Sequence, residues 1–574
     1  DFCLESPKKG KHGLYFTSAE NGKKIIVTQL SGNAETGEDG NVIEVEYPDK
    51  TTKKYYGSYA GALNSIKTTT KAGTYTIRNR AEYDNFDDKD ANALKNFANT
   101  NNTDVKLVFE SGDRGENNPD GAAGTRYRIR MRVQTLQLPA GVEVTFQNIV
   151  LKYAEGTRSA IKDAQNKDVQ DLVFVNNGGK LTFGANVKFL AGDNNAEGVP
   201  TVYGGAEGTN CDKEAILTFQ SGKYTAVYGG NKGEGSHTAK AVITVEKEAT
   251  VTDTLSGGGD AEQTKAAGKT AEITVNNALK VKNIYDYDKL TIENAITVTV
   301  TSTMDSEKTS DYMGETLLAE GASFTLPNAE GTKQMGSLKM KEGAEKNATL
   351  RLARAADASG KNASNKENPY ILTLTGTNPM KSQKGKIDVA YESGTETDND
   401  IVFYLPNAAT DAEVSCKPLQ SSFSLAMREK PVNRTIRIYD DTIAVFVGKS
   451  TTPEIKVNLA EAIDYIAEQE KANPGKQEYT ISIYKNEYTI NDADKKALKE
   501  IWDANSTRAA AKTAKKIVWT SQKNKDGTSL GTPATVMVSD NLWLFGKDEI
   551  VLENLTLKGT KAYNIYANGT PLTV

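Results

Sequence analysis

A long internal repeat limits the folds open to this sequence. Residues 42–66 align without a gap with residues 442–466, at an offset of 400 residues. The positions that are identical in both segments are Ile43, Val45, Thr51, Thr52, Ala60, Ala62 and Ile66. Self-similarity over so long a period indicates an array of structural repeats rather than a single globular core.

The repeat continues well beyond this first block. Tyr75-Thr76-Ile77 recurs as Tyr479-Thr480-Ile481, residues 146–152 face residues 552–558, and residues 177–183 face residues 568–574. These matches predict one full repeat to about residue 405, followed by the first part of a second repeat. Because the bare end of a stack of strands exposes unpaired backbone groups, we expect further polypeptide or another subunit to cover the end of the second repeat.

Each repeat combines short alternating strands with two helices. Residues 458–466 place Leu459, Ala462, Ile463 and Ile466 on one helical face, and a second helix is predicted over residues 494–504. The strands are separated by Gly and Asn turns, as in residues 171–183. We expect the helices to cover the first coil of a stack of strands.

The run Val-Tyr-Gly-Gly predicts how the strands are arranged. It occurs at Tyr203 and again at Tyr228, 25 residues later. This spacing suits one coil of a three-faced parallel β-helix, with glycines at the corners where φ is positive. An array of immunoglobulin-like sandwiches is the alternative, but it predicts hairpins and a unit of about 100 residues.

The segment Leu459-Ala460-Glu461-Ala462-Ile463, the Tyr-Thr-Ile strand and the Leu-Glu-Asn-Leu-Thr-Leu-Lys-Gly run at 552–559 carry a family resemblance. Over residues 50–300 and 455–574 the chain resembles bacterial surface proteins of the right-handed parallel β-helix, or pectin-lyase-like, class. The resemblance implies a secreted or surface-anchored protein, often an adhesin. The same fold also carries polysaccharide lyases and glycoside hydrolases, so it does not assign a function.

The predicted fold is all-β, with parallel β-helix (solenoid) units, short helical caps and small β-modules in tandem. We expect a small β-module over 1–50, a capped β-helix over 51–300, and its continuation or a β-rich module over 301–405. A second small β-module is expected over 406–450, and the start of a second β-helix over 451–574. In the second module, residues 435–439 are a counterpart of the first module's strands, and Cys416 lies near the position equivalent to Cys3.

The composition argues against several classes of partner and cofactor. Lys and Arg number 70 against 75 Asp and Glu, and the signs are mixed along the chain, which disfavours nucleic-acid binding. No apolar run is long enough to predict a transmembrane segment. Cys3, Cys211 and Cys416 have no CxxC spacing, so we predict no zinc site and no cofactor.

The residues that resemble catalytic or metal-binding motifs are mostly interpreted as having no catalytic role. Asn102-Thr103-Asp104 matches one polygalacturonase signature, but its Gly-His-Gly partner is absent, so we interpret it as a chance match. His237 follows a glycine-rich stretch and is interpreted as a solvated loop histidine. The acidic residues between Asp84 and Asp90 are interpreted as a solvated helix N-terminus rather than a calcium site. No catalytic or metal-binding residue is predicted.

Tyr203 and Tyr228 are the one predicted binding site. Stacked coils would align the two rings, and an exposed aromatic row stacks on sugar rings, which predicts carbohydrate binding. An internal aromatic stack that fills the core is the favoured alternative.

The sequence therefore predicts an extracellular or cell-surface protein, structural or adhesive and without catalytic activity. Its expected partners are other copies or neighbouring repeats of the same protein, glycans or a host surface. The alternative is a carbohydrate-active β-helix enzyme, either a polysaccharide lyase or a glycoside hydrolase, which requires an acidic cluster with Arg or Lys along one face.

Overall fold

The computed structural model divides the chain into two compact units. Unit 1 comprises residues 1–355, 372–388 and 406–408, and unit 2 comprises residues 356–371, 389–405 and 409–574. The structure describes residues 14–19, 24–29, 43–80, 84–98, 100–101, 104–112, 126–153, 172–192, 195–260, 269–301, 313–326, 333–353, 372–380, 384–393, 401–407, 416–418, 426–427, 435–439, 443–448, 450, 454–456, 458–483, 487–521, 533–539, 541–559 and 564–574.

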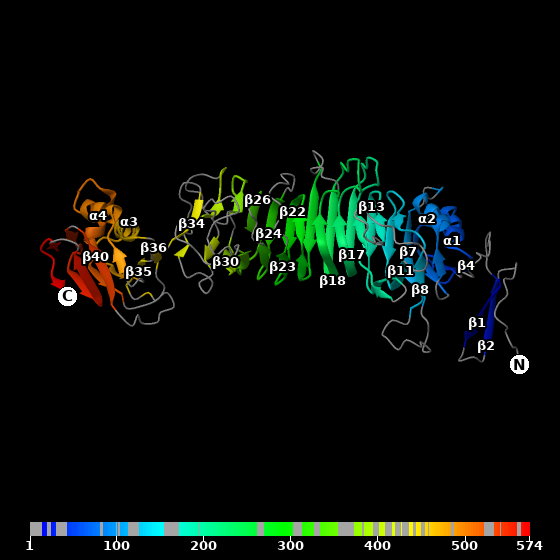
Figure 1. The fold of residues 1–574 in the computed structure, drawn as a ribbon, viewed down its shortest axis with the longest axis horizontal. Helices are drawn as coiled ribbons and strands as arrows, with labels where there is room; N and C mark the ends of the chain where they lie inside the picture. Colours follow the sequence, from blue (N-terminus) through cyan, green and yellow to red (C-terminus); the bar gives the residue numbers. More distant parts are fainter. Residues whose placement is uncertain are drawn as a thin grey trace. The chain divides into compact units, whose positions relative to one another are not determined.

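The described chain is mostly β, in several mostly parallel sheets, which confirms the all-β prediction at that level. The main sheet of unit 1 places successive strands side by side along the chain (Figure 1). Its parallel strands are β5 (Gly73–Asn79), β7 (Val105–Ser111), β10 (Glu143–Phe146), β13 (Gly179–Phe183), β17 (Ala215–Tyr228), β18 (Ala241–Ser256), β19 (Ala271–Val275), β22 (Tyr287–Ile292), β24 (Met313–Leu318) and β27 (Ser337–Met340).

Further sets of parallel strands follow the same order. One set contains β6 (Asp84–Phe86), β8 (Arg128–Met131), β11 (Ile149–Tyr153) and β14 (Val187–Ala191). Another contains β9 (Thr135–Gln137), β12 (Val173–Val175), β16 (Thr201–Tyr203), the last residues of β17 and β18, and β21 (Asn283–Tyr285). A third contains β20 (Leu279–Val281), β23 (Thr297–Val300), β25 (Ser323–Leu326) and β28 (Ala348–Ala353), and β26 (Lys333–Met335) pairs with β29 (Leu372–Leu374).

Parallel pairing aligns like side chains in rows, and one row fills the core of unit 1 with phenylalanines. Phe109, Phe146, Phe183 and Phe219 occupy matching positions on β7, β10, β13 and β17. Their ring centroids are 5.2, 5.6 and 5.5 Å apart, and the planes of each stacked pair are nearly parallel. All four rings are buried, so each strand contributes apolar area against the strand on either side.

Helices α1 (Tyr59–Lys67) and α2 (Asp88–Lys95) lie beside the first strands of this stack (Figure 1). Asp87 is the N-cap of α2 and forms a capping box with Asp90, which satisfies backbone donors of the first turn. The other carboxylate oxygen of Asp90 accepts a hydrogen bond of 2.6 Å from the Ala60 amide at the start of α1. One buried carboxylate therefore joins the two helix N-termini.

Unit 2 repeats this arrangement. Helix α3 (Leu459–Ala472) buries the four predicted residues, and helix α4 (Asp492–Glu500) replaces the helix predicted over 494–504. Asp494 forms a capping box with Asn491 and accepts the Ala460 amide at 2.9 Å, as Asp90 accepts Ala60. The helix prediction is confirmed, with α4 beginning two residues earlier because Asn491 is its cap.

The strands of unit 2 begin with β35 (Ile443–Val447) between β36 (Glu454–Lys456) and β37 (Glu478–Ile483), both antiparallel to it. In unit 1, β3 (Ile43–Glu46) lies in the same way between β4 (Lys53–Tyr56) and β5. Parallel strands β39 (Lys516–Thr520), β42 (Glu549–Glu553) and β45 (Leu572–Thr573) continue the sheet. Strands β38 (Glu487–Thr489), β40 (Ala534–Val538) and β43 (Leu555–Gly559) form a second set, and β41 (Leu542–Trp543) pairs with β44 (Ile565–Tyr566).

The register of these strands confirms the alignment of the two repeats. Ile43 pairs with Tyr56 and Asn79, and Ile443 pairs with Lys456 and Ile483, which reproduces the offsets of 400 and 404 residues. Left-handed asparagines recur at the turns as well: Asn148 and Asn554 have φ of 47° and 54°, and Asn177 and Asn568 have 56° and 48°. Asparagine tolerates this conformation better than most residues, so the recurrence has a steric reason.

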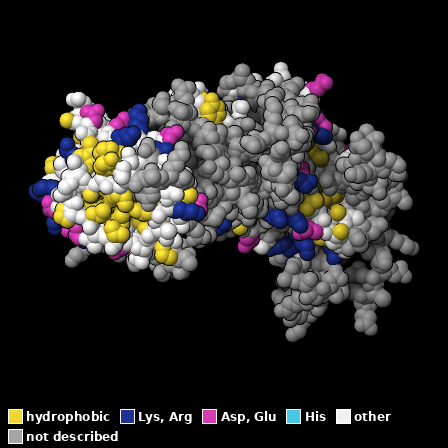
Figure 2. Space-filling model, turned by 60° about the vertical axis from the view of Figure 1, so that its left-hand side comes forward, with side chains coloured by type: hydrophobic (Ala, Val, Ile, Leu, Met, Phe, Trp, Pro, Cys, Tyr) yellow, Lys and Arg dark blue, Asp and Glu magenta, His cyan; other side chains and the backbone are white. Residues whose placement is uncertain are grey.

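The last strands of unit 2 leave apolar side chains exposed. Ile565 and Tyr566 on β44 are 40% and 39% exposed, and Val574 is 90% exposed. Hydrophobic side chains gather on the face of unit 2 that Figure 2 turns toward the viewer. Their counterparts in unit 1 are buried, because Phe174 on β12 pairs with Val202 on the next strand of its set.

Two further hairpins are described. In unit 1, β1 (Leu14–Ala19) pairs antiparallel with β2 (Lys24–Gln29). In unit 2, β33 (Ala426–Met427) pairs antiparallel with β34 (Thr435–Tyr439), which also pairs antiparallel with β31 (Ile401–Tyr404). The two cysteines that the structure describes, Cys211 and Cys416, are both buried.

Candidate functional site

The predicted tyrosine site forms a stacked pair. Tyr203 and Tyr228 are register partners on β16 and β17, with ring centroids 4.9 Å apart and an interplanar angle of 9°. Tyr203 is only 6% exposed and Tyr228 is half-buried. The rings are aligned as predicted, but only Tyr228 retains appreciable exposed surface. Sugar stacking on this pair stays a prediction that rests on Tyr228.

Polar side chains surround the pair and bond to one another. The Tyr203 hydroxyl donates a hydrogen bond of 2.7 Å to Asp260, whose other carboxylate oxygen accepts the Gly233 amide at 2.7 Å. Burial first, and then the Asp260 carboxylate, raise the pKa of Tyr203 well above its usual range. Nearby, Glu207 accepts 2.6 Å and 2.8 Å hydrogen bonds from Lys232 and Gln137. The contact between Glu207 and Lys232 joins the loop after β16 to the loop after β17.

His237 belongs to the loop between β17 and β18 and is buried, so the interpretation of a solvated loop histidine is wrong. Its side chain is 3% exposed, and its Nε2 lies 2.8 Å from the Lys213 carbonyl. An isolated parallel bridge joins His237 to the buried Cys211. Burial, and then the charge of Lys269, lower the pKa of His237 to about 4. A neutral buried imidazole with a backbone partner has a structural role here.

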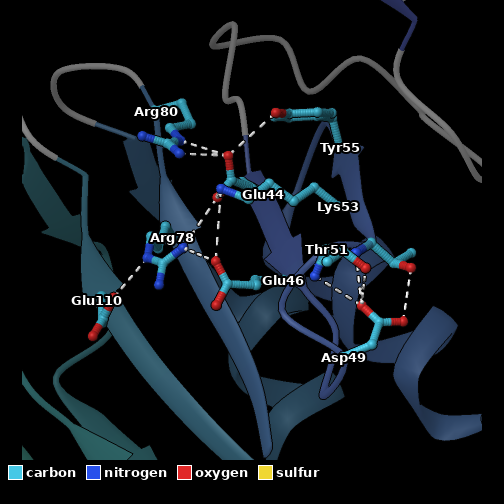
Figure 3. A network of polar contacts seen from close by, with 10 residues as sticks. Glu44, Glu46, Asp49, Thr51, Lys53, Tyr55, Arg78, Arg80 and Glu110 are labelled. Atoms are coloured by element: carbon cyan, nitrogen blue, oxygen red, sulfur yellow. Dashed lines mark hydrogen bonds and ion pairs between the residues drawn. The ribbon is translucent and has the colours of Figure 1, made fainter.

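A second polar cluster, the Glu44 network, lies on the outward face of β3, β4, β5 and β7 (Figure 3). Glu44 accepts hydrogen bonds from Arg78 at 3.1 Å and from Arg80 at 2.9 Å. Arg78 also bonds Glu46 at 2.8 Å and Glu110 at 2.6 Å. Lys53 adds a charge within 3.3 Å of Glu44, so three acidic and three basic side chains balance.

The Glu44 network does not have the electrostatics of a hydrolase site. Burial alone would raise the pKa of Glu44, but the hydrogen bond and charge of Arg80 and the charge of Lys53 lower it below its usual range. The hydrogen bond from Arg78 likewise lowers the pKa of Glu46. A carboxylate pair that performs acid–base catalysis needs one member with a raised pKa. Both members here stay ionised, as expected of a structural ion-pair cluster.

The second repeat does not preserve the Glu44 network. By register, Ala444 stands where Glu44 does, and Ser482 stands where Arg78 does. Thr520 occupies the place of Glu110. The repeats therefore share their inward rows and differ on this outward face. A chemical function that required the network would be confined to unit 1.

The remaining predicted candidates are distributed as follows. Asn102 and Thr103 lie outside the described residues, as do His12 and Cys3. The acidic stretch does form the N-terminus of α2, but Asp90 is 2% exposed rather than solvated. Within the described ranges, no cluster of three or more His, Cys, Asp and Glu side chains is placed to hold a metal ion. Nor is any described helix both long and apolar enough to span a membrane.

One feature was missed when the sequence was considered alone: the exposed side chains of Ile565 and Tyr566. The repeat alignment places them opposite Phe174 and Val175, which are core residues. Their alignment with core positions of the first repeat is the signal that would have identified them.

Comparisons with known proteins leave the family open. No family model, no curated protein and no solved structure matches this chain. The resemblance to pectin-lyase-like surface proteins therefore stays a prediction.

Proposed function

We propose that this chain is a non-enzymatic structural or adhesive repeat protein of a bacterial cell surface or the extracellular space. We further propose that its parallel strands form β-helix coils, which make a long protein from a thin core. The observation that carries the proposal is the recurrence of one pairing register in both repeats, with the inward rows retained and the outward face varied.

Repetition without a shared outward cluster suits a structural role better than catalysis. A catalytic site needs a fixed set of side chains, whereas the Glu44 network of unit 1 has no equivalent in unit 2. The outward face also carries pairs such as Lys180 and Glu143, 3.0 Å apart, which neutralise each other. Exposed pairs of this kind add little stability and leave little unbalanced charge to hold a charged substrate.

A glycan array combined with a polysaccharide depolymerisation screen tests this proposal on the full chain. We expect glycan binding without turnover, and weaker binding by Tyr228→Ala. Tyr404→Ala is the matched control, because Tyr404 is 40% exposed and lies on another strand. Turnover of any polysaccharide would overturn the non-enzymatic proposal. Equal binding by both variants would remove the tyrosine pair as the glycan site.

A further inference from the structure

The main sheet of unit 1 carries a long row of side chains on its outward face, which we call the Glu143 row. Its members hold one register position on successive strands from β5 to β27. In order along the stack they are Thr74, Lys106, Glu143, Lys180, Ile216, Val242, Glu272, Lys289, Glu315 and Ser337. The next residue along each strand, such as Leu181 on β13, is buried, so the row itself points outward.

The order of the Glu143 row is self-complementary about its midpoint, which lies between β17 and β18. Members at equal distances from this midpoint carry opposite charges, are both apolar, or both carry a hydroxyl group. The matched pairs are Ile216 with Val242, Lys180 with Glu272, Glu143 with Lys289, Lys106 with Glu315, and Thr74 with Ser337. A surface with this order complements a second copy of itself that is turned end over end.

A second outward row, two residues further along each strand, has the same symmetry. We call it the threonine row, because six successive strands place a threonine there: Thr145, Thr182, Thr218, Thr244, Thr274 and Thr291. Apolar side chains, Val108 and Leu317, continue it at both ends. Short side chains of one kind leave a flat strip that another flat sheet can approach closely.

Both rows are accessible in a single copy. The side chains of Lys106, Lys180 and Glu272 are 42%, 46% and 44% exposed. At the midpoint, Ile216 and Val242 are partly exposed although they are apolar. A partner that covers this face would therefore bury apolar area at its centre and charged side chains around it, which is the usual composition of a protein interface.

We infer that two copies of this protein pack face to face through the Glu143 and threonine rows. The two-fold axis lies parallel to the strands, between β17 and β18. It places Lys180 of one copy opposite Glu272 of the other, and Ile216 opposite Val242. Each contact occurs twice, as in any isologous interface. Ten strands spaced about 4.8 Å apart, over a width of roughly 20 Å, bury about 800 Å² on each copy, which is the standard size of a stable interface.

One pair of like charges meets at the rim of this interface, and each is neutralised within its own copy. Arg78 donates a hydrogen bond of 2.6 Å to Glu110, and Lys341 donates one of 2.7 Å to Glu293. The inference goes beyond the proposed function and does not depend on it, since Tyr228 lies in another set of strands.

Sedimentation velocity on charge-reversal variants of the full chain tests the contact. Lys180→Glu sets two acidic side chains against each other, and Glu272→Lys sets two basic ones. We expect each variant alone to dimerise about tenfold or more weakly than the unsubstituted chain, because every dimer contains the altered contact twice. An equimolar mixture of the two variants should recover the original affinity to within about threefold, because the mixed dimer has an acidic and a basic side chain at both contacts.

Recovery on mixing distinguishes contact between copies from effects within one copy. Lys180 and Glu272 lie three strands apart in the same chain, about 14 Å, and one variant cannot correct a folding defect in the other. Lys223→Glu is the matched control, because Lys223 is 40% exposed, is paired with Glu197 at 2.7 Å and lies outside both rows. We expect this control to dimerise like the unsubstituted chain. An unsubstituted chain that stays monomeric, a mixture no tighter than its components, or equal weakening by Lys223→Glu would overturn the inference.

Discussion

The substitution Phe183→Ala tests whether the phenylalanine row stabilises the stack of unit 1. Phe183 is fully buried and lies between Phe146 and Phe219, at 5.6 and 5.5 Å. Phe174 adds an edge contact at 5.0 Å, and Tyr224 lies at 5.3 Å. Truncating a buried Phe to Ala typically costs about 3–5 kcal/mol through lost burial and the cavity that remains.

The number of ring contacts places Phe183→Ala toward the upper part of that range. Each aromatic pair contributes about 0.5–1.5 kcal/mol beyond its buried area, and this ring takes part in several pairs. We therefore expect a local loss of about 4–5 kcal/mol. The Phe183→Leu variant keeps most of the volume and should lose less than half as much.

Native-state hydrogen exchange is the suitable assay, because strands that contact only their neighbours open locally. Protection should fall in β10, β13 and β17 and stay unchanged in unit 2. Thr182→Ala is the matched control on the same strand, since Thr182 is half-buried and outward-facing. Equal losses of protection in Phe183→Ala and Thr182→Ala would refute the role of the row.

Three further predictions concern buried polar groups. The pKa of His237 falls from 6.5 to about 4 on folding, so the neutral form stabilises the fold above pH 6.5 and this stability is lost as the pH falls toward 4. The loss is roughly 3 kcal/mol. In denaturant unfolding, the free energy of unfolding of His237→Gln should therefore depend less on pH over that interval, whereas an equal pH dependence in both proteins would indicate a general acid effect. Burial raises the pKa of Asp90 to about 6, so the stability that its protonated form contributes declines as the pH rises from 4 to 6, the reverse of the dependence expected for His237. An NMR titration of the Asp90 carboxyl that gives a midpoint near 4 would contradict this. Tyr203→Phe removes the hydrogen bond to Asp260 and should cost about 1.5–3 kcal/mol in thermal or chemical unfolding, whereas no change would mean that the Asp260 contact is not formed in solution.

Much of the fold follows from periodicities that the sequence displays. The i, i+3, i+4 pattern of residues 459–466 predicts α3, and the alternation of residues 179–183 predicts a strand with Leu181 and Phe183 inward. The alignment of the repeats was sound because inward residues such as Tyr75 and Tyr479 occupy the same place in the pairing, opposite Leu107 and Ile517. Local sequence patterns predict burial correctly where the alternation or helical spacing within one strand or helix decides which side chains face inward.

The candidate sites could not be predicted in this way, because their burial depends on distant segments. His237 is covered through its bridge to Cys211 in another loop, and nothing in the glycine-rich sequence around it specifies that pairing. Asp90 is buried by the N-terminus of α1, 30 residues away. In both cases a polar residue in a polar stretch was interpreted as solvated, but contacts between loops or between helices bury its side chain.

The left-handed asparagines at the turns limit how many residues such a chain can gain or lose without disturbing its strands. Asn186 donates a hydrogen bond of 2.9 Å to Asn148, so successive turns lie directly over one another. Insertion or deletion of a whole strand set extends or shortens the stack by about 4.8 Å and leaves every inward row continuous. Loss of a single residue shifts the turn and reverses which side chains face inward along the following strand. Variation in length between such proteins should therefore occur in whole sets of strands, while single-residue changes collect in the loops.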